Sequence, residues 1–317
     1  MRFYIKNGIF LLTVWLILAA ALILSTKTFA QNDVEKKPYA TKEINNIVYK
    51  VAQGQEIKLN LFLPTAEGEP ISNAPLLIDI VSGGWNSPGP GDGGFWRACK
   101  SVERGFAVAS VAHRSVAPDC IFPAQIEDIK AAVRFLRAHA KEYGIDPNRI
   151  AAYGTSSGGH MASMLGISDK FRLFDVGENL EQSSQVQIVI DLCCTADMAF
   201  YLERSPEQTP EPVYSVLGAS RDNNLSNSER AAPIIEKARK YSPITYVDND
   251  FSPTLILQGT RDQAVIPSQS CLFYEALNRA GVRTELYLDN SQGHTANLFP
   301  WEERIKLIFD FLQWSEN

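Results

Sequence analysis

Apolar and polar residues alternate in the first part of the chain, whereas later segments contain nearly continuous apolar runs. In residues 57–63, every second position from the first to the last is apolar, which is the pattern of a strand that buries one face. Residues 47–51 form a second short apolar segment just before it. Together the two segments predict an antiparallel hairpin, preceded by a polar and poorly ordered lead-in at residues 31–46.

Beyond the hairpin, mostly apolar runs are separated by stretches of helical periodicity. Continuous apolar runs are typical of parallel strands that are covered on both faces. The expected strands occupy residues 76–81, 106–112, 150–153, 186–192, 254–258 and 284–288. The expected helices occupy residues 95–104, 123–143, 159–167, 267–280 and 300–314. This alternation predicts an α/β fold with a mostly parallel sheet and helices on both of its faces.

Residues 196–250 interrupt the alternation of strands and helices. The segment is rich in Pro, Ser, Asn and charged residues, with one helical stretch near residues 228–240. Long segments without strands inside a compact domain are commonly functional insertions. We therefore expect a small cap over the active edge of the sheet, within a single domain at residues 47–317. A mobile surface excursion is the alternative.

The first thirty residues have the composition of a secretory signal. Arg2 and Lys6 precede an apolar run at residues 8–24, and a short polar segment then ends at Ala30. We expect cleavage after Ala30 and a secreted or periplasmic protein. The alternative is an uncleaved membrane anchor, because the apolar run approaches the ~20 residues that span a bilayer. Contact with a membrane is expected only in that second case.

The charge balance argues against a nucleic-acid partner. The chain has 30 basic and 36 acidic residues. Removing residues 1–30, which hold three basic residues and no acidic one, changes the net charge from −6 to 27 − 36 = −9. No stripe of basic residues is present, although nucleic-acid-binding proteins usually carry one. The acidity is explained by solubility alone.

The five cysteines show no spacing that is typical of a metal site. Cys99 and Cys120 flank the same expected strand, so they are candidates for a disulfide if the protein is exported. The alternative is that they are small buried hydrophobic residues. Cys193 and Cys194 are adjacent at the end of a strand, where their side chains should point to opposite faces. We do not expect these two to bond to each other.

The sequence Gly154-Thr155-Ser156-Ser157-Gly158 is the strongest chemical signal in the chain. It follows an expected strand and precedes an expected helix, as a nucleophile elbow does. The glycines permit a turn that is too sharp for side chains. This turn exposes the Ser156 hydroxyl and directs the N–H of Ser157 towards a reacting carbonyl oxygen.

A serine nucleophile requires a base, and the chain has four histidines. His294 lies in the loop between the last expected strand and the last helix, and loops at the carboxyl ends of parallel strands often carry catalytic groups. His139 lies on the surface of a helix, and His160 is expected to support the elbow from behind. His113 could line the cleft but precedes the nucleophile. We therefore expect His294 to be the base.

Asp262 is the expected acid, because it follows the strand at residues 254–258. Asp289, which follows the next strand, is the rival. A carboxylate that caps the following helix is the alternative role for Asp262. The order Ser156, Asp262, His294 is the order of the α/β-hydrolase triad.

Four further segments extend the pattern over residues 47–314. They are Ala117–Asp128 with its Phe122-Pro123-Ala124-Gln125 sequence, Tyr143–Ile150, Gly259–Pro267 and Gly293-His294. With the elbow, they resemble α/β-hydrolases of the esterase/lipase group, and in particular feruloyl-esterase-like and acetyl-xylan-esterase-like carbohydrate esterases. The resemblance implies an α/β-hydrolase fold with a mostly parallel eight-stranded sheet and a small cap. It also implies a serine carboxylic-ester hydrolase that forms an acyl-enzyme and needs neither a metal nor an organic cofactor.

The loop after the strand at residues 76–81 departs from this family. The usual sequence is His-Gly-Gly-Gly-Trp, whereas this chain has Val81-Ser82-Gly83-Gly84-Trp85. Backbone N–H groups form the oxyanion hole, so we expect donors from Ser82 or Gly83 together with Ser157. Because the loop is altered, a weak or inactive hydrolase that serves as a binding module is an alternative.

Aromatic residues near the expected cleft suggest the substrate. Trp85, Trp96 and Tyr201 are expected to contact a sugar ring or an aromatic acyl group, although buried aromatic residues are the alternative. The expected partner is therefore a small or carbohydrate ester. A serine peptidase would share the order of the triad, but this chain is too short to include the propeller domain of such peptidases.

Overall fold

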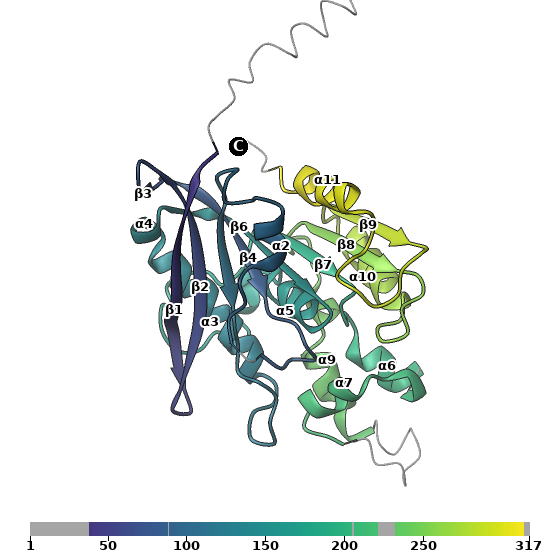
Figure 1. Cartoon of the computed structure of the whole chain (residues 1–317). Helices are drawn as coiled ribbons and strands as arrows, with labels where there is room; N and C mark the ends of the chain where they lie inside the picture. The colour runs from purple at the N-terminus through teal and green to yellow at the C-terminus, as the bar shows by residue number, and fades with distance from the viewer. Residues whose placement is uncertain (1–37, 88, 205, 221–231, 314–317) are drawn as a thin grey trace, which may run out of the picture. The chain divides into compact units, whose positions relative to one another are not determined.

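A sheet of nine strands forms the centre of the fold in the computed structural model (Figure 1). The structure describes residues 38–87, 89–204, 206–220 and 232–313. Within these ranges eight strands follow the order β1-β2-β5-β4-β6-β7-β8-β9, and the short β3 (Glu69–Pro70), which pairs with β2, is a ninth strand beyond the expected eight. The described residues from Tyr39 onwards belong to one compact unit.

The predicted hairpin is present but longer than expected. β1 (Ala40–Ala52) and β2 (Gln55–Ala66) pair antiparallel through a turn in which Gln53 and Gly54 have φ values of 51° and 74°. Two consecutive residues with positive φ match the right-handed twist of paired strands. The prediction of a lead-in up to residue 46 is therefore wrong from Ala40 onwards. Residues 31–37 lie outside the described residues.

The remaining strands confirm the predicted mostly parallel sheet. β5 (Ala107–Val111) pairs antiparallel with β2 and parallel with β4 (Ala74–Ile80). The strands that continue in parallel from β4 are β6 (Ile145–Thr155), β7 (Ile188–Leu192), β8 (Thr254–Gly259) and β9 (Thr284–Asp289). Their carboxyl ends therefore meet at one edge of the sheet.

Helices cover both faces of the sheet. Neighbouring residues of a strand point to opposite faces, so the sheet contributes apolar side chains to two separate cores. Leu76 belongs to one hydrophobic core and Leu77 to the other. The first core includes residues of α3 (Ala124–Ala138), α5 (Ser157–Leu165) and α10 (Ser268–Arg279). The second includes residues of α2 (Gly94–Ala98) and α11 (Trp301–Phe311).

Two of the predicted helices differ from the observed ones. The helix expected at residues 123–143 is divided at His139 into α3 and α4 (Ala140–Tyr143), and Gly144 ends α4 in the left-handed conformation. The helix expected at residues 95–104 is reduced to α2, which ends at Ala98.

The described part of residues 196–250 is a group of short helices between β7 and β8 (Figure 1). Tyr214 and Val216 are buried in the first core, so the segment packs on the sheet domain. Its helices are α6 (Met198–Arg204), η2 (Pro206–Gln208), α7 (Glu211–Val216), η3 (Ala232–Ile234), α9 (Ile235–Lys240) and η4 (Pro243–Tyr246). The first part of the stretch expected to be helical at residues 228–240 lies outside the described residues.

Within the described ranges, every helix is too short or too polar to cross a bilayer. The apolar run at residues 8–24, on which both the signal and the anchor interpretations depend, lies outside these ranges.

Candidate active site

The Gly-x-Ser-x-Gly motif forms a sharp turn between β6 and α5. Ser156 has φ 57° and ψ −121°, a backbone conformation that is strained for a residue with a side chain. A Cβ atom at Gly154 would lie 2.2 Å from the carbonyl carbon of Gly158, and one at Gly158 would lie 2.7 Å from the oxygen of Ile80. Only glycine therefore fits at either position of the motif.

The structure brings Ser156, His294 and Asp262 together. His294 Nε2 is 3.0 Å from Ser156 Oγ, and His294 Nδ1 is 2.7 Å from Asp262 Oδ2. An ionised carboxylate only accepts hydrogen bonds, so Nδ1 carries the proton and Nε2 is free to accept the hydroxyl proton. The three residues follow β6, β9 and β8, whose carboxyl ends lie at the same edge of the sheet.

The Asp262 carboxylate is held by several donors. Its side chain is fully buried. Oδ1 accepts hydrogen bonds from the N–H groups of Ala264 (2.9 Å) and Val265 (2.8 Å), and Oδ2 accepts one from Gln258 Nε2 (3.2 Å). The rival Asp289 instead accepts hydrogen bonds from Ser291 and Phe299 within its own loop. The geometry therefore favours Asp262 as the partner of His294.

His160 lies behind the elbow, in contact with the loop that follows β4. The Trp85 indole N–H can only donate, so its 3.2 Å contact makes His160 Nδ1 an acceptor. Nε2 then carries the proton and donates to the carbonyl oxygen of Tyr241 at 2.7 Å. Burial lowers the pKa of His160 to about 4, so the ring stays neutral at ordinary pH and continues to accept from Trp85.

The other two histidines lie away from Ser156. His113 contacts the carbonyl oxygens of Arg114 and Val81 and lines a separate polar pocket beside the β1–β2 turn. His139 stacks on Phe135, with ring centroids 4.2 Å apart. Neither lines the cavity in front of the nucleophile.

The loop after β4 is attached to the elbow by two hydrogen bonds. Ser82 Oγ donates to the carbonyl oxygen of Thr155 at 2.7 Å, and the Gly83 N–H donates to Ser157 Oγ at 3.2 Å. Among the described residues, Gly84 and Ser157 line the cavity in front of Ser156, whereas Ser82 and Gly83 do not. Sequence reasoning therefore missed Gly84, although the pair of glycines before Trp85 was a signal for it.

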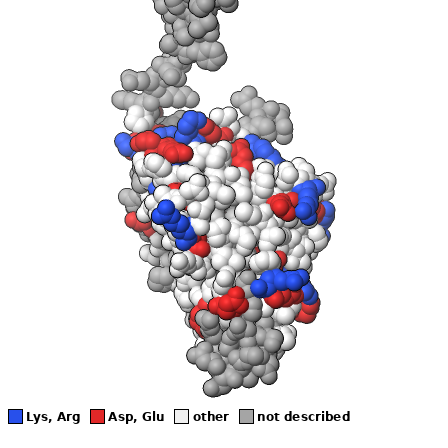
Figure 2. Space-filling view, turned by 90° about the vertical axis from the view of Figure 1, so that its right-hand side faces the viewer, with Lys and Arg blue, Asp and Glu red and all other residues white. Residues whose placement is uncertain are grey.

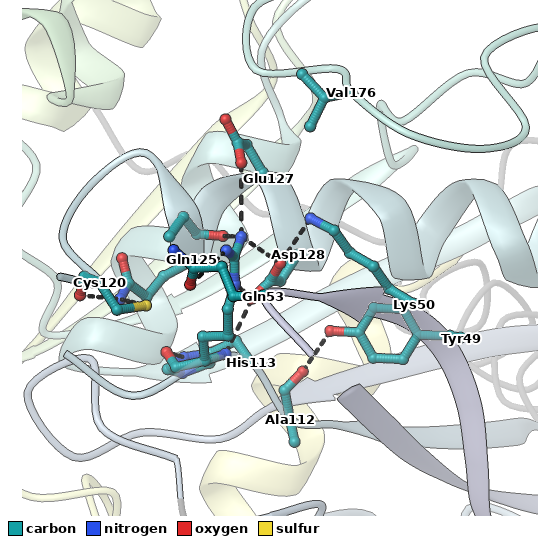
Figure 3. A network of polar contacts seen from close by, with 12 residues as sticks. Tyr49, Lys50, Gln53, Ala112, His113, Cys120, Gln125, Glu127, Asp128 and Val176 are labelled. Atoms are coloured by element: carbon teal, nitrogen blue, oxygen red, sulfur yellow. Dashed lines mark hydrogen bonds and ion pairs between the residues drawn. The ribbon is translucent and has the colours of Figure 1, made fainter. Parts of the chain in front are cut away.

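A buried ion-pair network holds the loop after β5 (Figure 3). Asp128 on α3 accepts hydrogen bonds from Arg114 Nε (2.8 Å), Arg114 Nη2 (2.8 Å) and Lys50 Nζ (2.7 Å). Because Lys50 lies on β1, the network joins the hairpin to α3 and to the loop. A buried carboxylate with these partners is compensated. The same loop carries Phe122, which stacks on His160 and packs edge-on against Trp85.

The cavity in front of Ser156 has a volume of about 180 Å³. His294 is the one lining side chain that can carry a charge among the described residues. The cavity is lined by Gly84, Trp85, Ser156, Ser157, Thr195, Pro210, Pro212, Val213, Ala264, Val265 and His294. Three of these residues, Pro210, Pro212 and Val213, come from the insertion, so the insertion forms part of the wall of this cavity.

Two of the three aromatic residues expected to contact the substrate do not line this cavity. Trp85 does line it. Trp96 is fully buried in the second core, where it packs against Tyr153 with ring centroids 5.2 Å apart. Tyr201 is also fully buried, and its hydroxyl accepts a hydrogen bond from the N–H of Ile266 at 2.8 Å. The predictions for Trp96 and Tyr201 are wrong because both rings are structural.

All five cysteines are free. Cys99 and Cys120, the candidate pair for a disulfide, are both free and buried, as the alternative of small buried residues describes. Cys99 Sγ instead donates to the carbonyl oxygen of Phe95 at 2.9 Å. Cys193 and Cys194 are buried, whereas Cys271 is exposed.

The face on the right-hand side of Figure 1 carries charges of both signs (Figure 2). On this face, basic and acidic side chains are interspersed around a neutral centre (Figure 2). No basic stripe crosses this face in the part of the chain that the structure describes.

The strand order and the elbow define an α/β-hydrolase. The family model BD-FAE matches residues 59–277, and the chain belongs to this family of α/β-hydrolase esterases. Esterase LipQ of Mycobacterium tuberculosis is 28% identical over 240 residues, which are 72% of this chain and 51% of LipQ. Esterase LipC of the same organism is 28% identical over 221 residues, which are 69% of this chain and 52% of LipC. The chain thus spans about half the length of these curated relatives.

Solved structures give the same assignment. A thermophilic esterase, Est2 of Thermogutta terrifontis, superimposes with a TM-score of 0.67 at 24% identity, over 87% of this chain and 91% of its own. A truncated carbohydrate esterase from gut microbiota superimposes with a TM-score of 0.64 at 25% identity, over 88% of this chain and 100% of its own. The fold is therefore that of an α/β-hydrolase.

Proposed function

We propose that this protein is a serine carboxylic-ester hydrolase with Ser156 as nucleophile, His294 as base and Asp262 as orienting acid. The observation that carries the proposal is the continuous hydrogen-bonded series from Ser156 Oγ through His294 to Asp262, with contacts of 3.0 and 2.7 Å. The esterase names of the relatives support the same class of reaction.

The proposed mechanism follows from the positions of the protons. His294 Nε2 takes the hydroxyl proton as Ser156 Oγ attacks the ester carbonyl, and Asp262 stabilises the imidazolium that forms. His294 then protonates the leaving alcohol, and the acyl group remains on Ser156. Water, activated by the same imidazole, attacks the acyl-enzyme and releases the acid.

We assign the oxyanion donors to the backbone N–H groups of Ser157 and Gly84, which both line the cavity. This assignment replaces the earlier expectation for Ser82 and Gly83. The two altered side chains do not abolish such a site, because backbone groups are the donors and because the loop is held by Ser82 and Trp85. A hydrolase is therefore favoured over an inactive binding module. No observation favours a peptidase.

The proposed substrates are esters with a short, neutral acyl group. A cavity of about 180 Å³ is below the ~300–1,000 Å³ that is usual for small-molecule pockets. Its apolar lining fits an acetyl group better than a bulky aromatic acyl group. The carbohydrate esterase among the structural neighbours supports a sugar as the alcohol.

The test compares the purified protein with Ser156→Ala and with Ser72→Ala, a control at an exposed serine. The substrates are p-nitrophenyl acetate, acetylated xylan and methyl ferulate. We expect Ser156→Ala to lose activity by about 10⁴-fold or more, Ser72→Ala to keep it, and acetyl esters to be preferred. Equal activity of both variants, or no labelling of Ser156 by a fluorophosphonate probe, would contradict the proposal.

We also propose that the protein is exported. The support is the basic, apolar and cleavage-site pattern of residues 1–30. N-terminal sequencing of the protein recovered outside the cytoplasm should begin at Gln31. A chain that retains residues 1–30 and fractionates with membranes would favour the anchor instead.

A further inference from the structure

A thiol lies beside the acid and the base of the proposed triad. The sulfur of Cys193, a carboxylate oxygen of Asp262 and a ring nitrogen of His294 all lie within 4.8 Å of one another. Cys193 takes no part in the proposed mechanism and forms no disulfide. Thiolate, imidazole and carboxylate are the ligands that zinc binds in proteins.

The backbone holds Cys193 firmly in this position. It follows the last residue of β7 and has φ 46°, so the chain leaves the strand direction at this point. Its N–H donates to the carbonyl oxygen of Leu257 on β8 at 2.9 Å, and its sulfur is 4.0 Å from the carbonyl oxygen of Thr295. The backbone of Cys193 is thus held in place, and its thiol lies next to the residue that follows His294.

The electrostatic surroundings of Cys193 favour a cation over a free thiolate. Burial, and after it the neighbouring negative charge of Asp262, raises the pKa of the Cys193 thiol. A thiolate formed here would be a second buried negative charge without a partner. A divalent cation would compensate both charges at once, which is the usual reason why metal ligands deprotonate on binding.

We propose that Cys193, Asp262 and His294 form a binding site for a thiophilic divalent cation such as Zn²⁺ or Cd²⁺, and that an ion bound there inhibits the enzyme. Zinc bonds of about 2.0–2.3 Å place tetrahedral ligand atoms about 3.5 Å apart. The sulfur must therefore approach by about 1 Å, and the 2.7 Å contact between His294 and Asp262 must open by a similar amount. The His294 side chain is 28% exposed, so this loop residue can move and solvent can deliver the ion.

Inhibition follows from the proton balance at His294. The ion takes the place of the proton on Nδ1, and that proton moves through solvent to Nε2. The ring then donates to Ser156 Oγ and no longer accepts its proton, so the base is lost. The Cys193 thiol releases its proton to solvent. One proton leaves the protein for each ion bound.

Binding can be tested without any ester. Cd²⁺ is titrated into the protein while the ultraviolet thiolate-to-cadmium absorption is recorded, with Cys271→Ser as a matched control at the exposed cysteine. The band should appear in the wild type and in Cys271→Ser, and should be absent from Cys193→Ser. In His294→Gln, which keeps Cys193, the apparent affinity should fall at least tenfold. A band of equal strength in Cys193→Ser, or no band in the wild type, would overturn the site.

Inhibition is tested with Zn²⁺ on hydrolysis of p-nitrophenyl acetate, each variant being normalised to its own rate without metal. Half-inhibition should require at least tenfold more Zn²⁺ in Cys193→Ser than in Cys271→Ser, and chelation should restore activity. Because one proton is released on binding, the zinc affinity should increase about tenfold for each unit by which the pH is raised, as long as the pH stays below the pKa of the thiol.

The inhibition by a bound ion rests on the proposed function. Failure of the inhibition and failure of the proposed function can be told apart. A protein that hydrolyses esters but is equally sensitive to Zn²⁺ in both variants would contradict inhibition at Cys193. A protein that binds Cd²⁺ through Cys193 but hydrolyses no ester without metal would contradict the proposed function and retain the site.

Discussion

The proposed triad and the proposed oxyanion loop both contact the elbow around Ser156 but are held in place in different ways. Asp262 is oriented by the N–H groups of Ala264 and Val265, two and three residues further along the chain. Trp85 is held by His160 and Phe122, which belong to other elements. The acid is thus organised by its own turn, whereas the oxyanion loop depends on long-range packing. Substitutions far from Ser156 should therefore affect the loop more than the acid.

The largest expected effect tests the acid side of this comparison. Asp262→Asn should lower kcat by about 10⁴-fold, because an amide favours the wrong His294 tautomer. Asp289→Asn, at the rival carboxylate, should lower it by less than about tenfold. Steady-state kinetics on p-nitrophenyl acetate measure both changes. The reverse ranking would show that Asp289 is the acid.

The next largest effect should come from His160, which contacts the proposed oxyanion loop from another element through Trp85. His160→Ala removes the acceptor for Trp85, so the Gly84 donor should be misplaced. The loss of one oxyanion donor costs about 3 kcal/mol, so we expect kcat to fall by about 10²-fold with little change in KM. His160→Gln, which keeps an acceptor and a donor, should recover part of the rate. His139→Ala should have no such effect; a rise in KM together with a fall in kcat would indicate general structural damage instead.

The pH dependence of the free energy of unfolding should depend on the same histidine, His160. The folded pKa of His160 is about 4, and its unfolded pKa is about 6.5. Between these values the unfolded chain binds the additional proton, so the contribution to stability is present above pH 6.5 and is lost as the pH falls towards 4. Relative to His160→Gln, the wild type should lose about 3 kcal/mol of unfolding free energy between pH 7 and pH 4. Denaturant titrations at both pH values measure this difference, and parallel pH profiles would contradict it.

The smallest effect concerns Ser82, one of the two residues that depart from the family pattern. Ser82→Gly restores the usual glycine but removes the 2.7 Å hydrogen bond to Thr155. Such a bond contributes about 1 kcal/mol, so kcat should change by about fivefold or less. A gain of 10²-fold would mean that Ser82 distorts the oxyanion hole.

The features that were predicted from the sequence depend on neighbouring residues. The strands around the site, the elbow and the order of Ser156, Asp262 and His294 all follow from apolar runs with a chemical group just after each run. Parallel strands bring such groups to one edge of the sheet whatever the details of packing. Errors within these features were limited to boundaries, such as the start of β1 at Ala40 and the break between α3 and α4.

The features that were missed depend on contacts between distant segments. Trp96 and Tyr201 are aromatic like Trp85, and only packing places Trp85 at the cavity and the other two in the interior. The same holds for the pairing of His160 with Trp85, which are 75 positions apart, and for the approach of Cys193 to Asp262 and His294.

The chain's local patterns were sufficient for its class of fold and for the proposed nucleophile, Ser156, because hydrophobic periodicity and glycine-dependent turns act over a few residues. Only the folded structure decides which tryptophan lines the cavity, which carboxylate contacts His294 and where the cysteines lie. Those outcomes depend on how side chains from separate strands and loops share a closely packed interior, where each position is defined by its neighbours in space.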